Sequence, residues 1–195
     1  MIKRALFGIV FLVLSCYYPS WGQTFKAGLV GGVTLSQIDG DQLGGFNKFG
    51  LQGGLRAAAV FSERWQLGIE LLYSQQGSRR INTDNPASIY DRIHLNMVEA
   101  PVLIHFSDWK FRVGAGLSYA RIINYKILDY SGADISEFQL LEPDVFSLVL
   151  GVAFNFNEHV GMDVRWSRYL NNIQADKEDA PFFGRLIGIR CIYTF

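Results

Sequence analysis

Apolar side chains occupy every second position over several long segments of the sequence, and glycine, polar or charged residues stand between them. In segment 49–61, for example, Phe49 and Leu51 share one parity, whereas Gln52 and Arg56 share the other. Successive side chains of a β-strand point to opposite faces, so each segment would have one apolar and one ionic face. This pattern is typical of strands that cross a bilayer with the apolar face toward lipid.

Eight segments of this kind can be delimited, and each has about the nine or more residues that a tilted strand needs to cross hydrocarbon. They are 24–34, 49–61, 64–75, 92–106, 110–122, 145–156, 159–170 and 184–195. Eight strands close a barrel that is filled by side chains and has no aqueous channel. We therefore expect an all-β fold, an eight-stranded antiparallel up-and-down transmembrane β-barrel over residues 23–195.

The connections between these segments alternate between long and short. The long connections are polar and rich in Gly, Asn, Asp and Ser; they are 35–48, 76–91, 123–144 and 171–183. The connections that alternate with them have only two or three residues. Outer-membrane barrels have short periplasmic turns and long extracellular loops. The order of connections therefore predicts a barrel with both ends of the chain on the periplasmic side.

The positions that alternate with the apolar ones carry charged side chains near the middle of the expected strands. They are Lys26, Arg56, Glu70, Glu99, Arg112, Asp163, Arg165 and Arg190. Isolated charges in a narrow interior are very costly, so we expect these cations and anions to form a paired, hydrated network that plugs the lumen. Frequent glycines on the same parity would leave room for the long arginines. A structural role is favoured here over conduction or catalysis.

The fourth segment departs from the simple alternation. Ile93, Leu95 and Met97 occupy one parity, whereas the apolar residues from Val98 onward occupy the other. An extra residue in a strand shifts the side chains that follow it to the opposite face, so we expect a β-bulge near Met97 and Val98. Pro101 cannot donate a ladder hydrogen bond and would add to the irregularity.

The first 22 residues have the three parts of a secretory signal peptide. Lys3 and Arg4 precede the apolar run 5–14, and small or helix-breaking residues follow up to Gly22. The run is too short to span a bilayer as a helix, which needs about 20 residues. We expect residues 1–22 to be cleaved and the rest to reach the bacterial outer membrane. Lipidation at Cys16 is the alternative processing event.

The charge balance and the cysteine content exclude several kinds of partner. Without residues 1–22 the 18 basic residues fall to 16, against 18 acidic residues. This slight negative excess argues against nucleic acid as a partner. Only two cysteines occur, so neither a disulfide framework nor a cysteine metal cluster is expected, and no cofactor is expected either.

Three short stretches resemble a known family. The strand Val98-Glu99-Ala100-Pro101-Val102-Leu103-Ile104 is similar to the leucine-glutamate-isoleucine-proline-leucine strand of the PorT-like outer-membrane β-barrel family of Bacteroidetes-type bacteria, although Ala100 replaces a larger aliphatic residue. The glycine-rich stretch 28–32 and the terminal Tyr193-Thr194-Phe195 also resemble that family. The resemblance implies an outer-membrane barrel without an established activity; some members are linked to protein secretion and gliding. The final Phe195 further resembles the signal that barrel-assembly machinery reads.

Other barrels suggest two alternatives. A soluble lipocalin-like barrel binds an apolar ligand inside. It requires an apolar interior and a polar exterior, which is the reverse of this pattern. A lipid-modifying barrel enzyme would need a constellation such as His94, Ser118 and a loop acid near the outer rim. We expect no catalysis, because nothing in the sequence fixes that geometry, and we expect His105 and His159 to be interfacial.

The sequence as a whole predicts a small outer-membrane barrel with a plugged lumen, acting as a structural or interaction component. The expected partners are outer-membrane lipid, the barrel-assembly machinery through Phe195, and a protein bound by the extracellular loops. An accessory role in protein secretion across the outer membrane is the alternative that the family resemblance adds.

Overall fold

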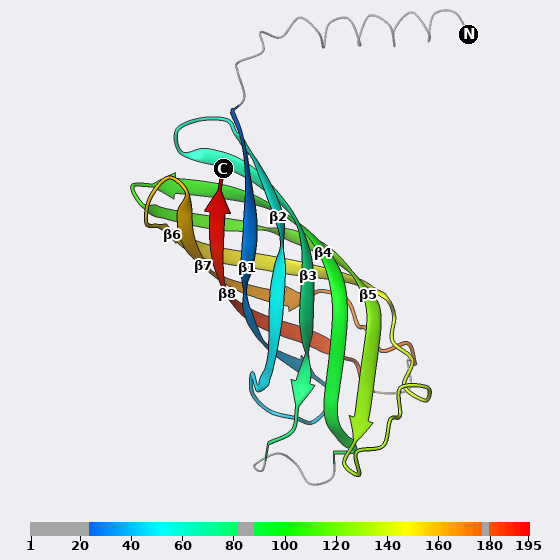
Figure 1. Cartoon of the computed structure of the whole chain (residues 1–195). Helices are drawn as coiled ribbons and strands as arrows, with labels where there is room; N and C mark the ends of the chain where they lie inside the picture. The colour runs from blue at the N-terminus through cyan, green and yellow to red at the C-terminus, as the bar shows by residue number, and fades with distance from the viewer. Residues whose placement is uncertain (1–23, 82–87, 177–179) are drawn as a thin grey trace, which may run out of the picture.

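The computed structural model of the chain describes residues 24–81, 88–176 and 180–195. The expected signal peptide, 1–22, and Cys16 lie outside the described residues. The strands are β1 (Thr24–Asp39), β2 (Lys48–Val60), β3 (Trp65–Arg79), β4 (Tyr90–Asp108), β5 (Phe111–Asp129), β6 (Asp144–Asn155), β7 (Val160–Tyr169) and β8 (Phe183–Thr194). They form one closed antiparallel barrel in sequence order, which confirms the predicted fold class (Figure 1).

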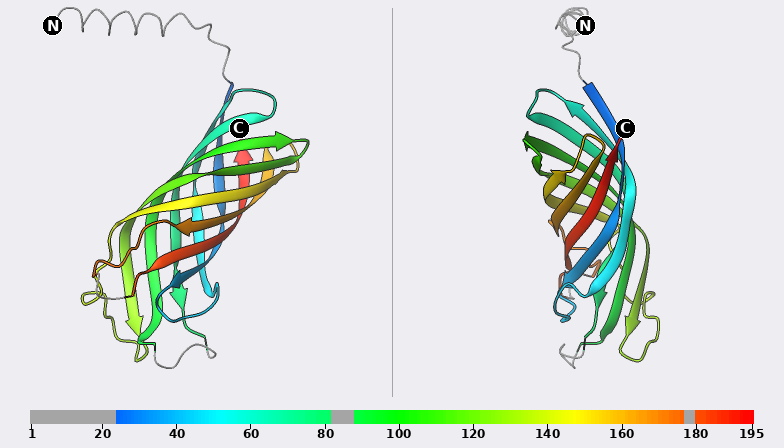
Figure 2. Two further views of the ribbon diagram at one scale, coloured as in Figure 1. Left: turned by 180° about the vertical axis from the view of Figure 1, so that it is seen from behind. Right: turned by 60° about the vertical axis from the view of Figure 1, so that its left-hand side comes forward.

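The ring closes because β1 pairs with β2 on one side and with β8 on the other. No strand edge is therefore left open for pairing with another chain. The first residues of β1 and the end of β8 lie at the same end of the barrel as the turns β2–β3, β4–β5 and β6–β7 (Figure 1). We call this the short-turn end and the opposite one the long-loop end; the strands are steeply tilted between them (Figure 2).

A belt of apolar side chains surrounds the barrel. On β4 the outward side chains are apolar from Val98 to Phe106, and on β5 from Phe111 to Tyr119. Most of these side chains are exposed, as Ile104 and Leu117 illustrate. Each belt spans about nine residues, the length of strand that crosses hydrocarbon. The exterior is thus the reverse of that of a lipocalin-like barrel.

Several strands continue past this belt at the long-loop end. β1 extends to Asp39, β3 to Arg79 and β5 to Asp129, and β4 begins at Tyr90, so parts of the segments expected to be loops are paired strands. Beyond the bilayer a barrel wall faces water, and an apolar inside with a polar outside becomes the favourable arrangement. The polarity of β4 and β5 therefore inverts along their length, which the predicted strand ends did not take into account.

This inversion accounts for the pattern of β4. Its odd-numbered side chains, including Ile93, Met97 and Glu99, all point inward without interruption, so the expected bulge does not lie in β4 itself. A register shift does occur at this height, between Asn96 and Met97, but the extra residue is Ile123 on β5. As a β-bulge requires, the inward positions of β5 change parity there.

The inward side chains of the long-loop end form an apolar plug rather than a continuation of the charged lumen. Its members are Ile38, Ile93, Leu95, Met97, Ala120, Ile122, Ile127, Val145, Tyr169, Ile173 and Phe182. They come from five strands and from the segment between β7 and β8. None of the described residues forms a helix that could span a membrane.

Candidate functional site

A cluster of buried charges lies in the middle of the lumen. Glu70 on β3 forms a bidentate ion pair with Arg165 on β7, with both N–O distances 2.9 Å. It also forms a single contact with Arg190 on β8, at 3.0 Å. Asp163 accepts from the same two arginines, at 3.3 Å from Arg165 Nη2 and 3.2 Å from Arg190 Nε. Arg56 on β2 lies farther away, with Nε 3.7 Å from Glu70 Oε1. We call these five residues the ion cluster.

Strand register explains part of this arrangement. Arg56 lies directly opposite Glu70 on the neighbouring strand, and Asp163 lies directly opposite Arg190. Side chains that face each other on one side of a sheet are within reach of each other. The pairs from Glu70 to Arg165 and Arg190 instead cross the barrel. The ion cluster therefore joins two strands on one side of the lumen to two strands on the other.

Glu99 belongs to a hydrogen-bond chain with uncharged partners instead of the ion cluster. Its carboxylate accepts from the amide of Gln52 at 3.3 Å and from the amide of Gln76, and no cation of the described residues lies within salt-bridge distance of it. Gln76 in turn accepts from the hydroxyl of Tyr169 at 2.8 Å. This chain connects the ion cluster, through Arg190 and Gln52 at 3.5 Å, to the apolar plug. The geometry therefore places Glu99 outside the direct ion pairs of the expected network.

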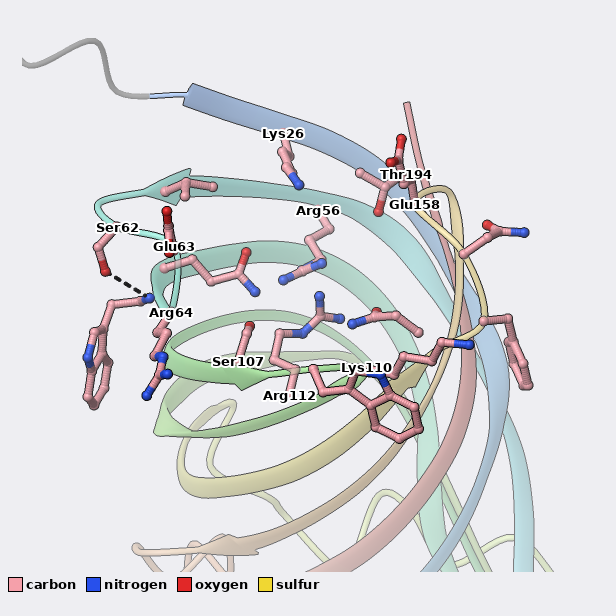
Figure 3. Close-up of a pocket in the computed structure, with 17 residues that line it drawn as sticks. Lys26, Arg56, Ser62, Glu63, Arg64, Ser107, Lys110, Arg112, Glu158 and Thr194 are labelled. Carbon is pink, nitrogen blue, oxygen red and sulfur yellow. Dashed lines mark hydrogen bonds between the residues drawn. The ribbon is translucent and has the colours of Figure 1, made fainter.

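Two further cations of the expected network lie outside the ion cluster. Lys26 is exposed at the short-turn end, and Arg112 is buried beneath it (Figure 3). Within the described residues neither has an acidic side chain within salt-bridge distance. The structure therefore separates the predicted charges into three groups. These are the ion cluster, the hydrogen-bonded Glu99, and two cations without ion pairs, Lys26 and Arg112, at the short-turn end.

His105 is part of the lumen, which corrects the expectation that it is interfacial. It is buried on the inward face of β4, and its ring lies against Gly68 and Gly114 on the two neighbouring strands. His105 and Glu99 are an even number of residues apart in one strand, so their side chains face the same side of the sheet. This spacing is the signal in the sequence that could have located His105. His159, in contrast, lies exposed beside Tyr193 at the short-turn end.

The fit of His105 against glycine gives a testable prediction. A Cβ atom on Gly114 would lie 2.6 Å from His105 Cδ2, which is too close for van der Waals contact. We expect Gly114→Val to destabilise the barrel by about 1–3 kcal/mol through overpacking. His105→Ala in the same chain should recover much of this loss, whereas equal losses with and without His105 would contradict the proposed contact. Urea unfolding in lipid vesicles measures both.

The residues considered for catalysis do not come together. His94 is an even-numbered residue of β4 and lies on the outward face, where its ring contacts Asn96 at 3.2 Å. Ser118 is buried on the inward face of β5. The barrel wall thus separates the two side chains, and they cannot act on one substrate. No group of three or more metal-ligating side chains occurs in the described part of the chain.

Solved structures and a family model place this architecture among known proteins. Ail, the attachment invasion locus protein of Yersinia pestis, superposes with a TM-score of 0.52 at 12% sequence identity, over 87% of this chain and 98% of that chain. Neisserial surface protein A gives a TM-score of 0.49 at 13% identity, over 89% and 99% of the two chains. At such identities the likeness concerns the fold alone. A search of curated proteins found no match.

The model of the outer membrane protein beta-barrel domain matches residues 7–185, most of the chain. The match includes β1 to β7 in full and the beginning of β8. Together with the closed ring, the apolar belt and the buried charges, this match shows that the chain belongs to the outer membrane protein beta-barrel domain family.

Proposed function

We propose that this outer-membrane protein is a closed anchor that presents a binding surface outside the cell at its long-loop end. The observation that carries the proposal is the hairpin of β4 and β5. At about 3.3 Å per residue and a tilt of about 45°, 19-residue strands reach roughly 44 Å along the barrel axis. This exceeds the hydrocarbon thickness of about 30 Å, so the hairpin projects beyond the bilayer.

The loop that follows β5 carries apolar side chains with no cover. Tyr130, Phe138 and Leu140 are 75%, 82% and 62% exposed. Exposed apolar side chains that lie outside the lipid belt are a frequent feature of interaction surfaces. We call these three residues the loop surface, and a protein partner is the occupant that their chemistry favours.

Local hydrogen bonds give this loop a defined shape. Asp129 accepts from the backbone N–H groups of Ser131 and Ala133, and Asp134 accepts from the backbone and hydroxyl of Ser136. The Ser136 hydroxyl bond, with Lys126 nearby, holds the pKa of Asp134 below its ordinary value. A loop that is ordered before binding loses less conformational entropy when a partner docks.

Crosslinking on intact cells tests the proposed surface. We expect the triple change Tyr130→Ser, Phe138→Ser and Leu140→Ser to reduce the yield of crosslinked adducts formed with a membrane-impermeant reagent by about tenfold, a loss of about 1.4 kcal/mol in binding. Trp109→Ser, an equally exposed aromatic at the short-turn end, serves as the control and should leave the adducts unchanged. The same adducts in the triple variant would reject the loop surface.

The plugged interior supports an anchor over a channel. The ion cluster, the Glu99 hydrogen bonds and the apolar plug succeed one another along the lumen. We expect the purified barrel to give no stable current steps in planar bilayers, because side chains occupy the path. Reproducible steps that persist in independent preparations would contradict the closed anchor.

Finer assignments rest on the sequence. We propose membership of the PorT-like group on the 98–104 strand, with an accessory role in protein secretion as the corresponding alternative function. We also propose that Phe195, exposed next to Tyr193 at the end of the chain, is recognised by the barrel-assembly machinery. Cleavage of residues 1–22 completes this set of proposals. Deleting Phe195 and following the folded fraction in outer membranes tests the recognition step.

A further inference from the structure

The short-turn end of the lumen opens into a cavity of about 380 Å³. This volume lies within the range of about 300–1,000 Å³ that is usual for small-molecule sites. Its lining contains five cations, Lys26, Arg56, Arg64, Lys110 and Arg112, and two acids, Glu63 and Glu158. The cavity is therefore strongly basic, although the whole chain has no net charge.

Buried arginines form the floor of this cavity. Arg56 and Arg112 are only 6% and 8% exposed. Arg56 Nη2 and Arg112 Nε are buried and have no hydrogen-bond partner among the described residues. Buried guanidinium groups are costly to leave without partners, and these two also repel each other. The floor thus has donors that an incoming acceptor could satisfy.

The acids of the lumen do not meet this need. Glu70 and Asp163 are each held at 3.3 Å or less by Arg165 and Arg190, whereas the nearest contact of Arg56 to Glu70 is 3.7 Å. Arg112 has no such contact within the described chain. The two acids of the ion cluster are therefore engaged mainly by Arg165 and Arg190, and Arg56, the outermost member of the cluster, faces the mouth together with Arg112.

The side chains converge on one point from different strands. Figure 3 shows Lys26 from β1, Arg56 from β2 and Arg112 from β5 with their nitrogen ends directed toward one another across the mouth. Gln66, Ser107 and Thr194 add neutral polar groups to the wall. Guanidinium forks bind phosphate and carboxylate oxygens in a bidentate manner, and an ammonium group adds a point charge.

We propose that this mouth is a binding site for a phosphate group, supplied either by a soluble phosphorylated molecule or by an anionic lipid headgroup. A phosphate monoester carries about −1.5 to −2 charges at neutral pH and has three acceptor oxygens, so it matches three converging cations better than a single carboxylate does. The proposal concerns the short-turn end and is independent of the partner proposed for the long-loop end.

Calorimetric titration of the full, detergent-purified barrel with inorganic phosphate, against chloride at equal ionic strength, tests the site. We expect saturable binding to the unaltered barrel and at least about a tenfold weaker affinity in Arg112→Gln. Lys26→Gln, at an exposed position, should weaken binding by a smaller factor. Arg121→Gln, an exposed arginine beyond the lipid belt on the same strand, is the matched control and should bind as the unaltered barrel does.

Loss of folding can be separated from loss of binding by the heat-induced change in gel mobility of each variant. If Arg112→Gln does not fold, Lys26→Gln alone decides the outcome. Absence of saturable phosphate binding to the folded, unaltered barrel would overturn the proposal, and so would equal affinities in the Arg121→Gln control and in both mouth variants.

Nanodiscs distinguish the two sources of phosphate. In phosphatidylglycerol discs a headgroup site should be occupied already, and inorganic phosphate should bind at least about fivefold more weakly than in phosphatidylcholine discs. Equal affinities in the two kinds of disc would assign the site to a soluble molecule. Both results support a phosphate site in the mouth, since each requires saturable binding that Arg112→Gln weakens.

Discussion

Glu70→Gln is expected to lower the free energy of unfolding of the barrel by about 3–5 kcal/mol. The substitution keeps the size of the side chain and removes the charge that faces Arg56, Arg165 and Arg190. Three buried guanidinium groups would then share Asp163 alone, and removing one partner of a buried pair leaves the other charge uncompensated. Urea unfolding in lipid vesicles, followed by tryptophan fluorescence, measures the loss.

A surface pair supplies the comparison. Lys126→Gln removes the pair with Asp134, whose side chains are 59% and 51% exposed, and should cost only about 0–1 kcal/mol. If Glu70→Gln and Lys126→Gln had the same small effect, the ion cluster would not stabilise the barrel. Combining Glu70→Gln with Arg165→Gln should cost less than the sum of the two single changes, because the removed charges interact directly.

Ile127→Ala is the second substitution with a large expected effect, about 2–5 kcal/mol of stability. Ile127 is completely buried in the apolar plug, and truncation would leave a cavity between tightly packed neighbours at the long-loop end. The same unfolding measurement applies, and the loss should be independent of ionic strength because no charge is involved.

Ile123 on the same strand offers a matched control for the apolar plug. It is the bulged residue of β5 and faces outward, with more than half of its surface exposed. Ile123→Ala removes the same atoms without forming a cavity, so it should cost much less than Ile127→Ala. Similar losses at the two positions would show that the plug is not a packed core.

The sequence predicts the strands well because membrane-facing strands must alternate. The apolar row from Phe111 to Tyr119 and the arginine at 112 on the opposite parity are enough to assign both faces of β5. The order of short and long connections fixes which strands are neighbours. The rule that apolar side chains face outward fails beyond the lipid belt, where the barrel wall faces water. There Ile93 and Leu95 point inward, because the interior at the long-loop end is apolar.

The site is less predictable than the strands. Parity places a side chain in the lumen but not at a height within it, because height depends on strand tilt and on the stagger between strands. Lys26, Arg112 and Glu70 share the inward parity, yet only Glu70 lies in the ion cluster. The pair between Glu70 and Arg165, which are 95 residues apart, requires the closed ring to bring the two strands across from each other.

The ion cluster draws its members from β2, β3, β7 and β8 and from no strand between them. Its bonds across the lumen therefore cannot be completed while the sheet is still an open ribbon, since β7 and β8 carry Arg165 and Arg190, the two cations closest to Glu70. Before β8 joins β1, Glu70 on β3 has only Arg56 of the adjacent strand as a counter-charge, because its two closer partners, Arg165 and Arg190, lie on β7 and β8. The ion pairs of the lumen thus form in the same step that closes the barrel. An incompletely closed barrel is therefore less stable, because Glu70 lacks these pairs.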